Sequence, residues 1–510
     1  MKNNKQIELL KDLWNSNDIL RPNKIIEYGP YILSMVFYKY LSDRAVRLIA
    51  PAEITDPAQV QAAYEKAYEE TEIREKLGYV IEPRFTFTAL VTRADQQLEM
   101  LAQAFAKIEA TDEFYRDIFS ELELNSKKLG QKRTQIVLEI IKTSAKLNNV
   151  EYQELALSDI YTGLLQVISQ SAGTKGIGLY SPASVNELMS KLLLKELAGK
   201  SEFTVYDPTM WSGTLLLELQ KYSDALIKYY GQEGNSELYD LARMNFIIHG
   251  VNEEEQVLNN GDALGDDWPN NGELDFDAVL MNPPFSERWH ADKALLQDPR
   301  YERYGVLAPK AKADFAYLLQ GLHHLKEKGT MAIILPHGIL FRGNAEEKLR
   351  RQLINENVID TIIGLPSNLF HYMNIPTAIV ILKKDRATKD ILFIDASAEF
   401  DKGRIQNTMN AEQIEKVLDA YVKRADIDKF AHVASYEEIF ENEFNLNISR
   451  YVDTFEEEAI AMDTVVADLK AAQVESKRVQ ANLYHSLEKL VDEYGESEES
   501  IRLFLKGMKK

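Results

Sequence analysis

The chain has 510 residues, enough for two or three domains with apolar cores. It contains no cysteine, which excludes disulfide bonds and thiolate metal sites, and no apolar run approaches the ~20 residues that cross a bilayer. Its 80 acidic side chains outnumber its 59 basic ones, and the net charge of −21 excludes strong unaided attraction to phosphates. We expect a soluble cytoplasmic protein that would need a local basic surface or a partner to bind nucleic acid.

Residues 1–165 are predicted to form a helical domain. Apolar side chains recur every three or four positions between residues 25 and 41, which is typical of a helix with one buried face. Further helices are predicted over residues 62–76, 93–108 and 134–147. The region has no convergent polar cluster, so we interpret it as a scaffold or clamp and not as a second active site.

A glycine-rich segment, residues 173–178, predicts a flexible hinge between this domain and the next. After it, Ser181 or Ser184 is expected to cap a helix over residues 186–197, with Pro182 suited to the first turn of that helix.

Residues 166–425 are predicted to form an α/β domain, since strands and helices alternate from residue 203 to about residue 395. This pattern favours a mostly parallel, doubly wound, Rossmann-like sheet, whose ligands bind outside the carboxyl ends of the strands. Strands are predicted at residues 203–206, 227–232, 278–281, 331–335, 358–365, 378–382 and 391–394. Helices are predicted at residues 214–222, 237–249, 313–326, 345–355 and 411–424.

Residues 426–510 are predicted to be a carboxyl-terminal extension with one long helix over residues 456–494. Its apolar side chains fall near heptad spacing among dense charge, which resembles the seam of a coiled coil. The chain offers no matching stripe, so we expect this helix to dock onto another subunit; packing on the body of the same chain is the alternative.

The most distinctive stretch is Asn282-Pro283-Pro284-Phe285, directly after an apolar predicted strand. Prolines cannot continue a strand ladder, so the backbone leaves the sheet there with little freedom. The result is a rigid cup with a carboxamide, exposed carbonyls and a ring, suited to the amino group of a planar base. Alone, it could equally be an ordinary strand-ending turn.

Three acidic residues precede this stretch, two of them directly after predicted strands and the third in the segment before it. Asp207 begins a loop between a strand and a helix, where a cofactor can approach the backbone closely if small residues are present, and it could pair with a cationic amino group. Glu233 could bind ribose hydroxyls, and Asp262 could accept from an adenine amino group. Each could instead be a cap, a solvated carboxylate or a turn residue. Their order at successive strand ends indicates a cofactor site of the Rossmann type.

The order of these motifs resembles the N6-adenine DNA methyltransferases, and specifically the modification (M) subunit of type I restriction–modification systems. The resemblance covers nearly the whole chain, including the helical amino-terminal region and the long carboxyl-terminal helix. Supporting segments are residues 38–44, 178–185, 241–250, 334–342, 364–370 and 375–383.

The resemblance implies that the methyl donor is S-adenosylmethionine and that the acceptor is a flipped-out adenine in duplex DNA. The amino group of that adenine would donate to the Asn282 carboxamide oxygen and the Pro283 carbonyl, while Phe285 stacks on the ring; Pro284 completes the catalytic motif. No metal is implied, and His290 could relay a proton, although we favour a surface role for it. The residues implied in cofactor binding are Tyr180, Ser181, Pro182, Asp207, Thr209, Ser212, Gly213, Glu233 and Asp262.

The resemblance also implies partners: a specificity (S) subunit that recognises the DNA sequence, a second M subunit, a restriction (R) subunit and double-stranded DNA. An acidic M subunit then need not hold DNA alone. Basic candidates for local DNA contact are Arg288, Lys310, Lys312, Arg342 and residues 348–351.

One position departs from the family pattern, because Trp211 stands where that pattern has glycine. Glycine there permits close backbone approach and a positive φ. We hypothesise that Trp211 narrows or fills the cofactor pocket and leaves a subunit that assembles but methylates poorly; an outward-turned indole in a relaxed loop would retain activity.

Three rival functions remain open. The chain could be an assembly subunit that clamps DNA without catalysis, or a methyltransferase of protein glutamine, whose planar amide also suits the cup. A nicotinamide oxidoreductase is disfavoured because the glycine-rich fingerprint is incomplete and the cup would have no role.

Overall fold

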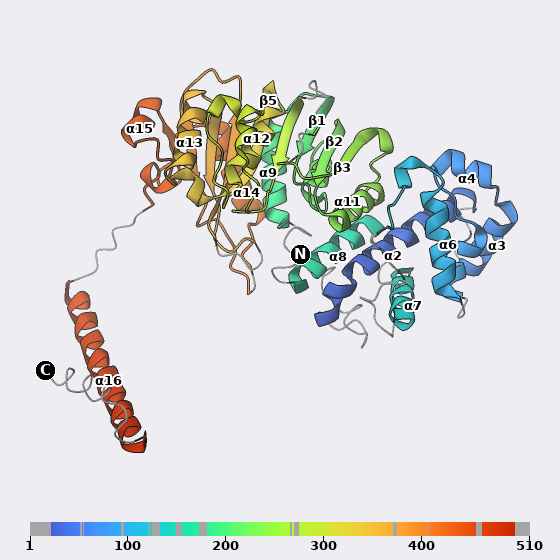
Figure 1. The fold of residues 1–510 in the computed structure, drawn as a ribbon, viewed down its shortest axis with the longest axis horizontal. Coiled ribbons are helices and arrows are strands. Elements are labelled where there is room, and N and C mark those ends of the chain that lie inside the picture. Colours follow the sequence, from blue (N-terminus) through green and yellow to red (C-terminus); the bar gives the residue numbers. More distant parts are fainter. Residues whose placement is uncertain are drawn as a thin grey trace. The chain divides into compact units, whose positions relative to one another are not determined.

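The computed structural model describes residues 22–50, 54, 56–92, 96–120, 122, 124, 133–148, 156–172, 181–265, 268–269, 275–370, 375–404, 406–454 and 462–494. Two compact units are present, Met1–Asp453 and Thr454–Lys510. The first unit contains a helical region and a large sheet with helices on both faces (Figure 1). The finer division into residues 1–165, 166–425 and 426–510 stays a prediction.

The helical region is built around α2 (Pro22–Ile49), whose apolar side chains form the centre of a core that also includes residues of the other helices. Those helices are α3 (Pro57–Ala67), α4 (Glu70–Leu77), α5 (Phe87–Thr92), α6 (Gln97–Glu109), α7 (Arg133–Ala145) and α8 (Leu157–Ala172). The single helix expected over residues 62–76 is wrong, because the backbone is extended at Tyr68 and Glu69. That break lets Tyr64 of α3 and Ile73 of α4 bury their side chains in the same core, so tertiary packing outweighs local propensity.

Nine strands form one sheet in the order β3-β2-β1-β4-β5-β7-β6-β8-β9. The first five in this order are parallel, β7 runs antiparallel between β5 and β6, and β9 is antiparallel to β8. The strands are β1 (Glu202–Asp207), β2 (Leu226–Glu233), β3 (Gln256–Asn260), β4 (Phe276–Met281), β5 (Leu325–Pro336), β6 (Ile359–Gly364), β7 (Thr377–Lys383), β8 (Ile391–Asp395) and β9 (Ala431–Ala434).

Each face of the sheet is covered by its own set of helices. One core joins the sheet to α9 (Ala183–Glu196), α10 (Thr214–Glu218) and α14 (Ala411–Lys423). The other joins it to α12 (Asp314–His323), α13 (Ala345–Asn355) and α15 (Tyr436–Glu441). Burial on both faces explains why the central strands read as near-continuous apolar runs. The α/β, doubly wound prediction is confirmed.

All seven predicted strands are present, and the predicted helices of this domain differ mainly at their ends. The sequence reasoning missed β3 and β9, which are short, partly exposed outer strands without apolar periodicity. It also extended α12 too far, because Leu325 and Lys326 already belong to β5. The predicted serine cap of α9 is wrong: Pro182 occupies the N-cap position without a side-chain hydrogen bond.

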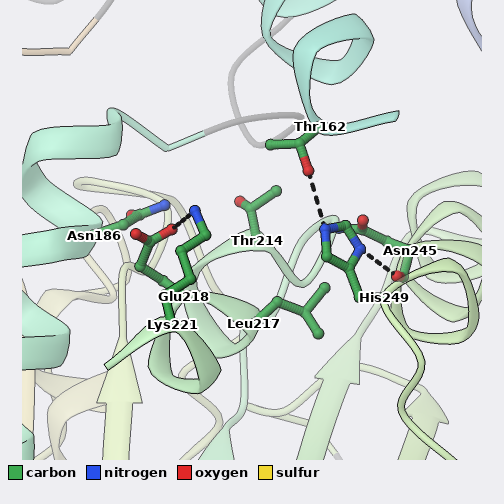
Figure 2. Close-up of a pocket in the computed structure, with 8 residues that line it drawn as sticks. All are labelled: Thr162, Asn186, Thr214, Leu217, Glu218, Lys221, Asn245 and His249. Carbon is green, nitrogen blue, oxygen red and sulfur yellow. Dashed lines mark hydrogen bonds and ion pairs between the residues drawn. The ribbon is translucent and has the colours of Figure 1, made fainter. Parts of the chain in front are cut away.

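Helix α11 (Ser236–Ile248) packs against both the sheet and the helical region. Leu241, Met244 and Ile247 lie in the core of the helical region, whereas Phe246 lies in the core beneath the sheet. Figure 2 shows His249, just after this helix, hydrogen-bonded to Thr162 of α8 at a small pocket that both residues line. The two parts of the first unit therefore share one helix.

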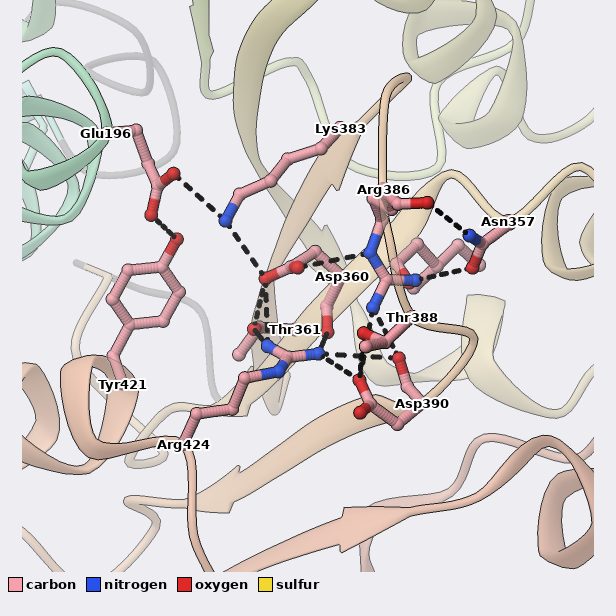
Figure 3. A network of polar contacts seen from close by, with 11 residues as sticks. Glu196, Asn357, Asp360, Thr361, Lys383, Arg386, Thr388, Asp390, Tyr421 and Arg424 are labelled. Atoms are coloured by element: carbon pink, nitrogen blue, oxygen red, sulfur yellow. Dashed lines mark hydrogen bonds and ion pairs between the residues drawn. The ribbon is translucent and has the colours of Figure 1, made fainter.

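A buried ionic network joins strands and helices at the end of the sheet opposite the carboxyl ends of the parallel strands (Figure 3). Asp360, near the start of β6, accepts from Arg386 Nε at 3.1 Å and Arg424 Nη1 at 3.3 Å. Lys383 Nζ lies 3.5 Å from Asp360 Oδ2 and 3.0 Å from Glu196 Oε2. Burial alone would raise the pKa of Asp360, but the three cations hold it below its usual value.

Replacing Asp360 by asparagine should destabilise the fold by about 3 kcal/mol at pH 7, since three cations would lose their shared carboxylate. Because the pKa of Asp360 is lowered on folding, the wild-type advantage should be present above the unfolded pKa of about 4 and be lost as the pH falls. Urea denaturation of both chains across pH would measure this. Equal stability at pH 7 would contradict the role assigned to the network.

The second unit consists, in its described part, of helix α16 (Met462–Tyr494). The predicted long helix is thus confirmed over these residues. Its seam is uncovered within its own unit: Val466, Leu469 and Leu483 are each at least 40% exposed. Docking onto another subunit stays a prediction.

Candidate functional site

The topology of the sheet brings the predicted site residues to one edge. The chain moves outward from β1 to β2 and β3 and then returns to β4 on the other side of β1, so the strand order reverses between β1 and β4. Such a reversal opens a crevice at the carboxyl ends of the strands. Asp207 and Glu233 end β1 and β2, while Asp262 and Asn282 lie just beyond β3 and β4.

Asp207 is a buried carboxylate held by its own loop. Its Oδ1 accepts from the backbone N–H of Thr209 at 2.8 Å and from the Thr209 hydroxyl at 3.1 Å. Burial nevertheless raises the pKa of Asp207 to about 7, and nearby Glu233 adds to the rise. No basic side chain among the described residues pairs with it, which leaves the carboxylate suited to an external cationic group.

Glu233 fixes the backbone of the loops that follow β1 and β2. Its Oε1 accepts from the N–H of Asn235 at 2.8 Å and its Oε2 from the N–H of Trp211 at 3.1 Å. Burial raises its pKa despite these bonds. The backbone N–H of Gly234 also bonds this carboxylate, which retains acceptor capacity that a ligand hydroxyl could use.

Asp262 lies on a turn whose backbone is fixed by its own carboxylate and by the side chain of Arg300. Its Oδ1 accepts from the N–H of Leu264 at 3.0 Å, so it does act as a turn residue in the free protein. The buried side chain of Arg300 donates to the Ala263 carbonyl at 3.0 Å and to Gln320 Oε1 at 2.9 Å. Asp262 is therefore exposed to solvent on a turn whose backbone is held in place.

The predicted cofactor loop, residues 207–214, is anchored at Ser212 and Gly213. Both are buried, and Gly213 has a φ of 77°. A Cβ on Gly213 would lie 2.5 Å from the Phe246 ring, so glycine is required there both for conformation and for space. The helix that follows, α10, has only five residues, which is shorter than expected.

Trp211 connects this loop to the loop after β4, which contains Asn282-Pro283-Pro284-Phe285 and is called the acceptor loop below. Its φ is 52°, a left-handed conformation that glycine adopts more easily. The half-buried indole donates from Nε1 to the backbone carbonyl of Asn282 at 2.8 Å. The loop has therefore kept the backbone conformation typical of glycine, and the indole lies against the Asn-Pro-Pro-Phe stretch.

The Asn282 carboxamide is oriented by Ser181. Asn282 Nδ2 donates to the Ser181 hydroxyl at 3.1 Å, so the amide oxygen Oδ1 is the end that does not face Ser181. Ser181 thus contacts the acceptor loop instead of capping α9. Pro182 is buried at the start of α9, and Tyr180 lies outside the described residues.

The rest of the cup is held by packing. Pro283 is buried, while Pro284 and Phe285 are partly exposed. The Phe285 ring meets the ring of Phe370 edge to face, with centroids 5.4 Å apart. Phe370 was not predicted, although it ends a segment, residues 364–370, that carried the resemblance.

Sequence reasoning also missed Asp314 and Glu287. The buried Asp314 accepts from the N–H of Ser286 at 2.7 Å and holds that residue at a φ of 53°. Glu287 accepts from the Tyr317 hydroxyl at 2.7 Å, and its charge reaches Glu233. The position of Glu287, two residues after Phe285, was the available signal; nothing in the sequence pairs Asp314 with that loop.

The basic candidates divide into two groups. Arg288 and Lys310 are exposed, and so is His290, in keeping with the surface role favoured for it. Arg342 instead pairs with Asp314 and Glu346 at 3.2 and 3.1 Å, and the buried Arg350 donates to three backbone carbonyls. These two arginines stabilise the fold and are not free for DNA.

The described residues contain neither a candidate metal site nor a candidate membrane-spanning helix. In that part of the chain, no group of three or more His, Asp or Glu side chains could hold a metal ion. None of its helices is sufficiently long and apolar to pass through a membrane.

Comparisons with known proteins identify the family of the chain. A family model described as N-6 DNA Methylase matches residues 153–459, and one described as HsdM N-terminal domain matches residues 9–142. The type I restriction enzyme MpnII methylase subunit of Mycoplasma pneumoniae is 30% identical, over 98% of this chain and 96% of that protein.

Solved structures extend the comparison to the fold. The methyltransferase subunit of a type I restriction–modification system from Streptococcus thermophilus is 45% identical, with a TM-score of 0.80 over 89% of this chain and 99% of that one. A structure from work on assembly and conformational transition of the type I system has 18% identity and a TM-score of 0.63, over 97% of this chain and 99% of that one. The chain therefore belongs to the N-6 DNA methylase family and, within it, to the methyltransferase subunits of type I restriction–modification systems.

Proposed function

We propose that this chain transfers a methyl group from S-adenosylmethionine to the N6 amino group of a flipped-out adenine in duplex DNA. One observation carries the proposal: the loops after β1 and β4 meet, with the Trp211 Nε1 atom 2.8 Å from the Asn282 carbonyl oxygen. A cofactor held by the first loop would therefore lie beside a base held by the second.

The acidic residues of the crevice fit the donor. S-adenosylmethionine supplies an electrophilic methyl group on a sulfonium, and its amino acid part carries a cationic amino group. Asp207 is a buried carboxylate without a basic partner among the described residues, which suits that amino group. Glu233 would accept from ribose hydroxyls, and Asp262 would accept from the adenine amino group.

The acceptor loop fits an exocyclic amine. Flipping the base costs a few kcal/mol, and the Phe285 face offers stacking in return. Asn282 Oδ1 and the Pro283 carbonyl would each accept a hydrogen bond from one N–H group of the amine. These two bonds favour a pyramidal nitrogen with an available lone pair. Ser181 keeps the carboxamide in the orientation that this requires. Alignment of the two groups supplies much of the rate gain, and the extra proton leaves to solvent.

We propose further that the chain works in a complex with a specificity subunit, a second modification subunit and a restriction subunit, on double-stranded DNA. The family membership supports this, as do the acidic net charge and the uncovered apolar seam of α16. The DNA target would be chosen by the specificity subunit.

Trp211 supports a second candidate: a subunit that assembles and clamps DNA but methylates poorly. Its indole occupies space in the loop that the cofactor must approach, at a position where the family has glycine. The protein-glutamine alternative has no comparable observation in its favour.

Transfer of a labelled methyl group to unmethylated duplex DNA, with the specificity subunit present, tests the proposal. If the chain methylates adenine, the label should enter unmethylated duplex DNA and should not enter fully methylated duplex. DNA binding without incorporation would identify the impaired subunit. Incorporation into a glutamine-containing protein, and not into DNA, would overturn the proposal.

Cofactor affinity should depend on pH through Asp207. Because its pKa is about 7 in the free protein, protons compete with a cationic ligand, and affinity should be roughly tenfold weaker at pH 6 than at pH 8. Close to one proton should be released per cofactor bound at pH 6. Calorimetry in two buffers of different ionisation enthalpy would measure it, and Asp207→Asn should bind weakly at both pH values.

A further inference from the structure

The segment 241–250, which carried part of the resemblance, has no role in the proposed chemistry, yet it lies directly behind the cofactor loop. Most of it forms α11, whose apolar residues are divided between two cores. Leu241, Met244 and Ile247 belong to the core of the helical region, and Ala242 and Phe246 to the core beneath the sheet. A displacement of the helical region would therefore be felt at the sheet through this helix.

Two residues of α11 contact the cofactor loop itself. The fully buried Asn245 donates from Nδ2 to the Ser212 carbonyl at 2.8 Å. Phe246 fills the space above Gly213 so closely that a Cβ there would lie 2.5 Å from the ring. Asn245 Oδ1 has no hydrogen-bond partner in the described structure, so Ser212 alone fixes this amide.

His249 links the same helix to the helical region (Figure 2). Its Nδ1 lies 2.8 Å from the backbone carbonyl of Asn245, which can only accept, so Nδ1 carries the proton. Nε2 is then the acceptor, and the Thr162 hydroxyl of α8 donates to it at 3.2 Å. Burial lowers the pKa of His249, which favours the neutral ring in which Nε2 accepts from Thr162.

We propose that Asn245 and His249 are positioning residues for the methyl donor. Asn245 fixes the position of the cofactor loop through its hydrogen bond to Ser212. His249 couples that position to α8 through its hydrogen bond to Thr162. Docking of the helical region and ordering of residues 207–214 are then coupled through the Thr162–His249 contact, and a movement of the helical region that breaks this contact changes cofactor affinity. The proposal rests on the cofactor site assigned above.

Thr162 offers a test that leaves the loop and the sheet untouched, because it is only half-buried. Thr162→Val removes the hydroxyl at nearly equal volume, and Thr162→Ser restores it. Tyr40→Phe is the matched control. The Tyr40 hydroxyl donates to the Ile247 carbonyl at 3.3 Å, so this substitution deletes one bond between the helical region and α11 that does not involve the His249 ring.

Two measurements on the full chain apply. Amide hydrogen exchange of residues 207–214 without cofactor should be about three- to tenfold faster in Thr162→Val and faster still in Asn245→Ala, in line with the loss of one hydrogen bond. Titration with S-adenosylmethionine should show a dissociation constant raised by a similar factor, with kcat at saturation unchanged. Thr162→Ser should match wild type in both, as should Tyr40→Phe.

The proposal is overturned if Thr162→Val and Tyr40→Phe behave alike in both measurements. It is also overturned if Thr162→Val lowers kcat and leaves the affinity unchanged. Failure of wild type and of Trp211→Gly to bind S-adenosylmethionine would instead remove the cofactor assignment, while the exchange experiment still decides whether α11 orders the loop. Should Asn245→Ala not fold, the Thr162 pair remains decisive.

Discussion

Asn282→Ala is expected to reduce methyl transfer about a thousandfold or more, while complex assembly and cofactor affinity stay close to wild type. The substitution removes the carboxamide oxygen that would accept from the adenine amine, and with it one of two contacts that favour a pyramidal nitrogen. The backbone carbonyl of Asn282, which accepts from Trp211, remains. Labelled transfer to duplex DNA in the assembled complex, together with calorimetric titration of the cofactor, would measure both effects.

Ser181→Ala is the matched control for this prediction. It leaves Asn282 Oδ1 in place and removes only the hydroxyl that accepts from Nδ2, so a loss of about tenfold is expected from weaker orientation of the amide. Full activity in Asn282→Ala would remove the proposed mechanism. Equal losses in the two variants would mean that orientation, and not hydrogen bonding by Oδ1, is what the residue provides.

The sheet could be predicted from the sequence because its central strands are buried on both faces. Val279 packs on one side and Leu280 on the other, so the strand reads as an unbroken apolar run before Asn282. Outer strands lack that signal: β3 has the sequence Gln-Val-Leu-Asn-Asn and is half-exposed. The same reasoning correctly placed Asp207 and Asn282 at the ends of neighbouring strands, since parallel strands bring their carboxyl ends to one edge.

What the sequence could not supply are contacts between residues distant along the chain. Ser181 and Asn282 are 101 positions apart, and Ser286 and Asp314 are 28 apart, yet each pair shapes the acceptor loop. Neither partner has a local pattern that points to the other. Ser181 had looked like a helix cap because serine before a helix usually is one.

Trp211 is the position where the sequence and the expected activity conflict. A non-glycine residue at a φ of 52° carries strain of about 1 kcal/mol. The loop has kept the conformation, and the indole bonds to Asn282. The tryptophan is thus accommodated without remodelling of the backbone, and the space it takes lies between the two halves of the proposed site.

Trp211→Gly is therefore expected to raise affinity for S-adenosylmethionine about ten- to a hundredfold and to raise methylation with it. Glycine removes both the ring and the strain, and Ser212, Gly213 and Glu233 already hold the loop in place. Calorimetric titration of both chains, followed by labelled transfer in the complex, would measure the change. Equal affinities would sink the hypothesis that the indole obstructs the cofactor.

Trp211→Phe separates bulk from hydrogen bonding, because it retains a ring but has no N–H for the Asn282 carbonyl. If bulk obstructs the cofactor, this variant should bind as weakly as wild type, and only glycine should restore affinity. If the bond from Nε1 instead tethers the acceptor loop, phenylalanine and glycine should both raise kcat with little change in affinity. Either result assigns the indole a position in the catalytic cycle, because the tether acts on the acceptor half of the site and the obstruction on the donor half.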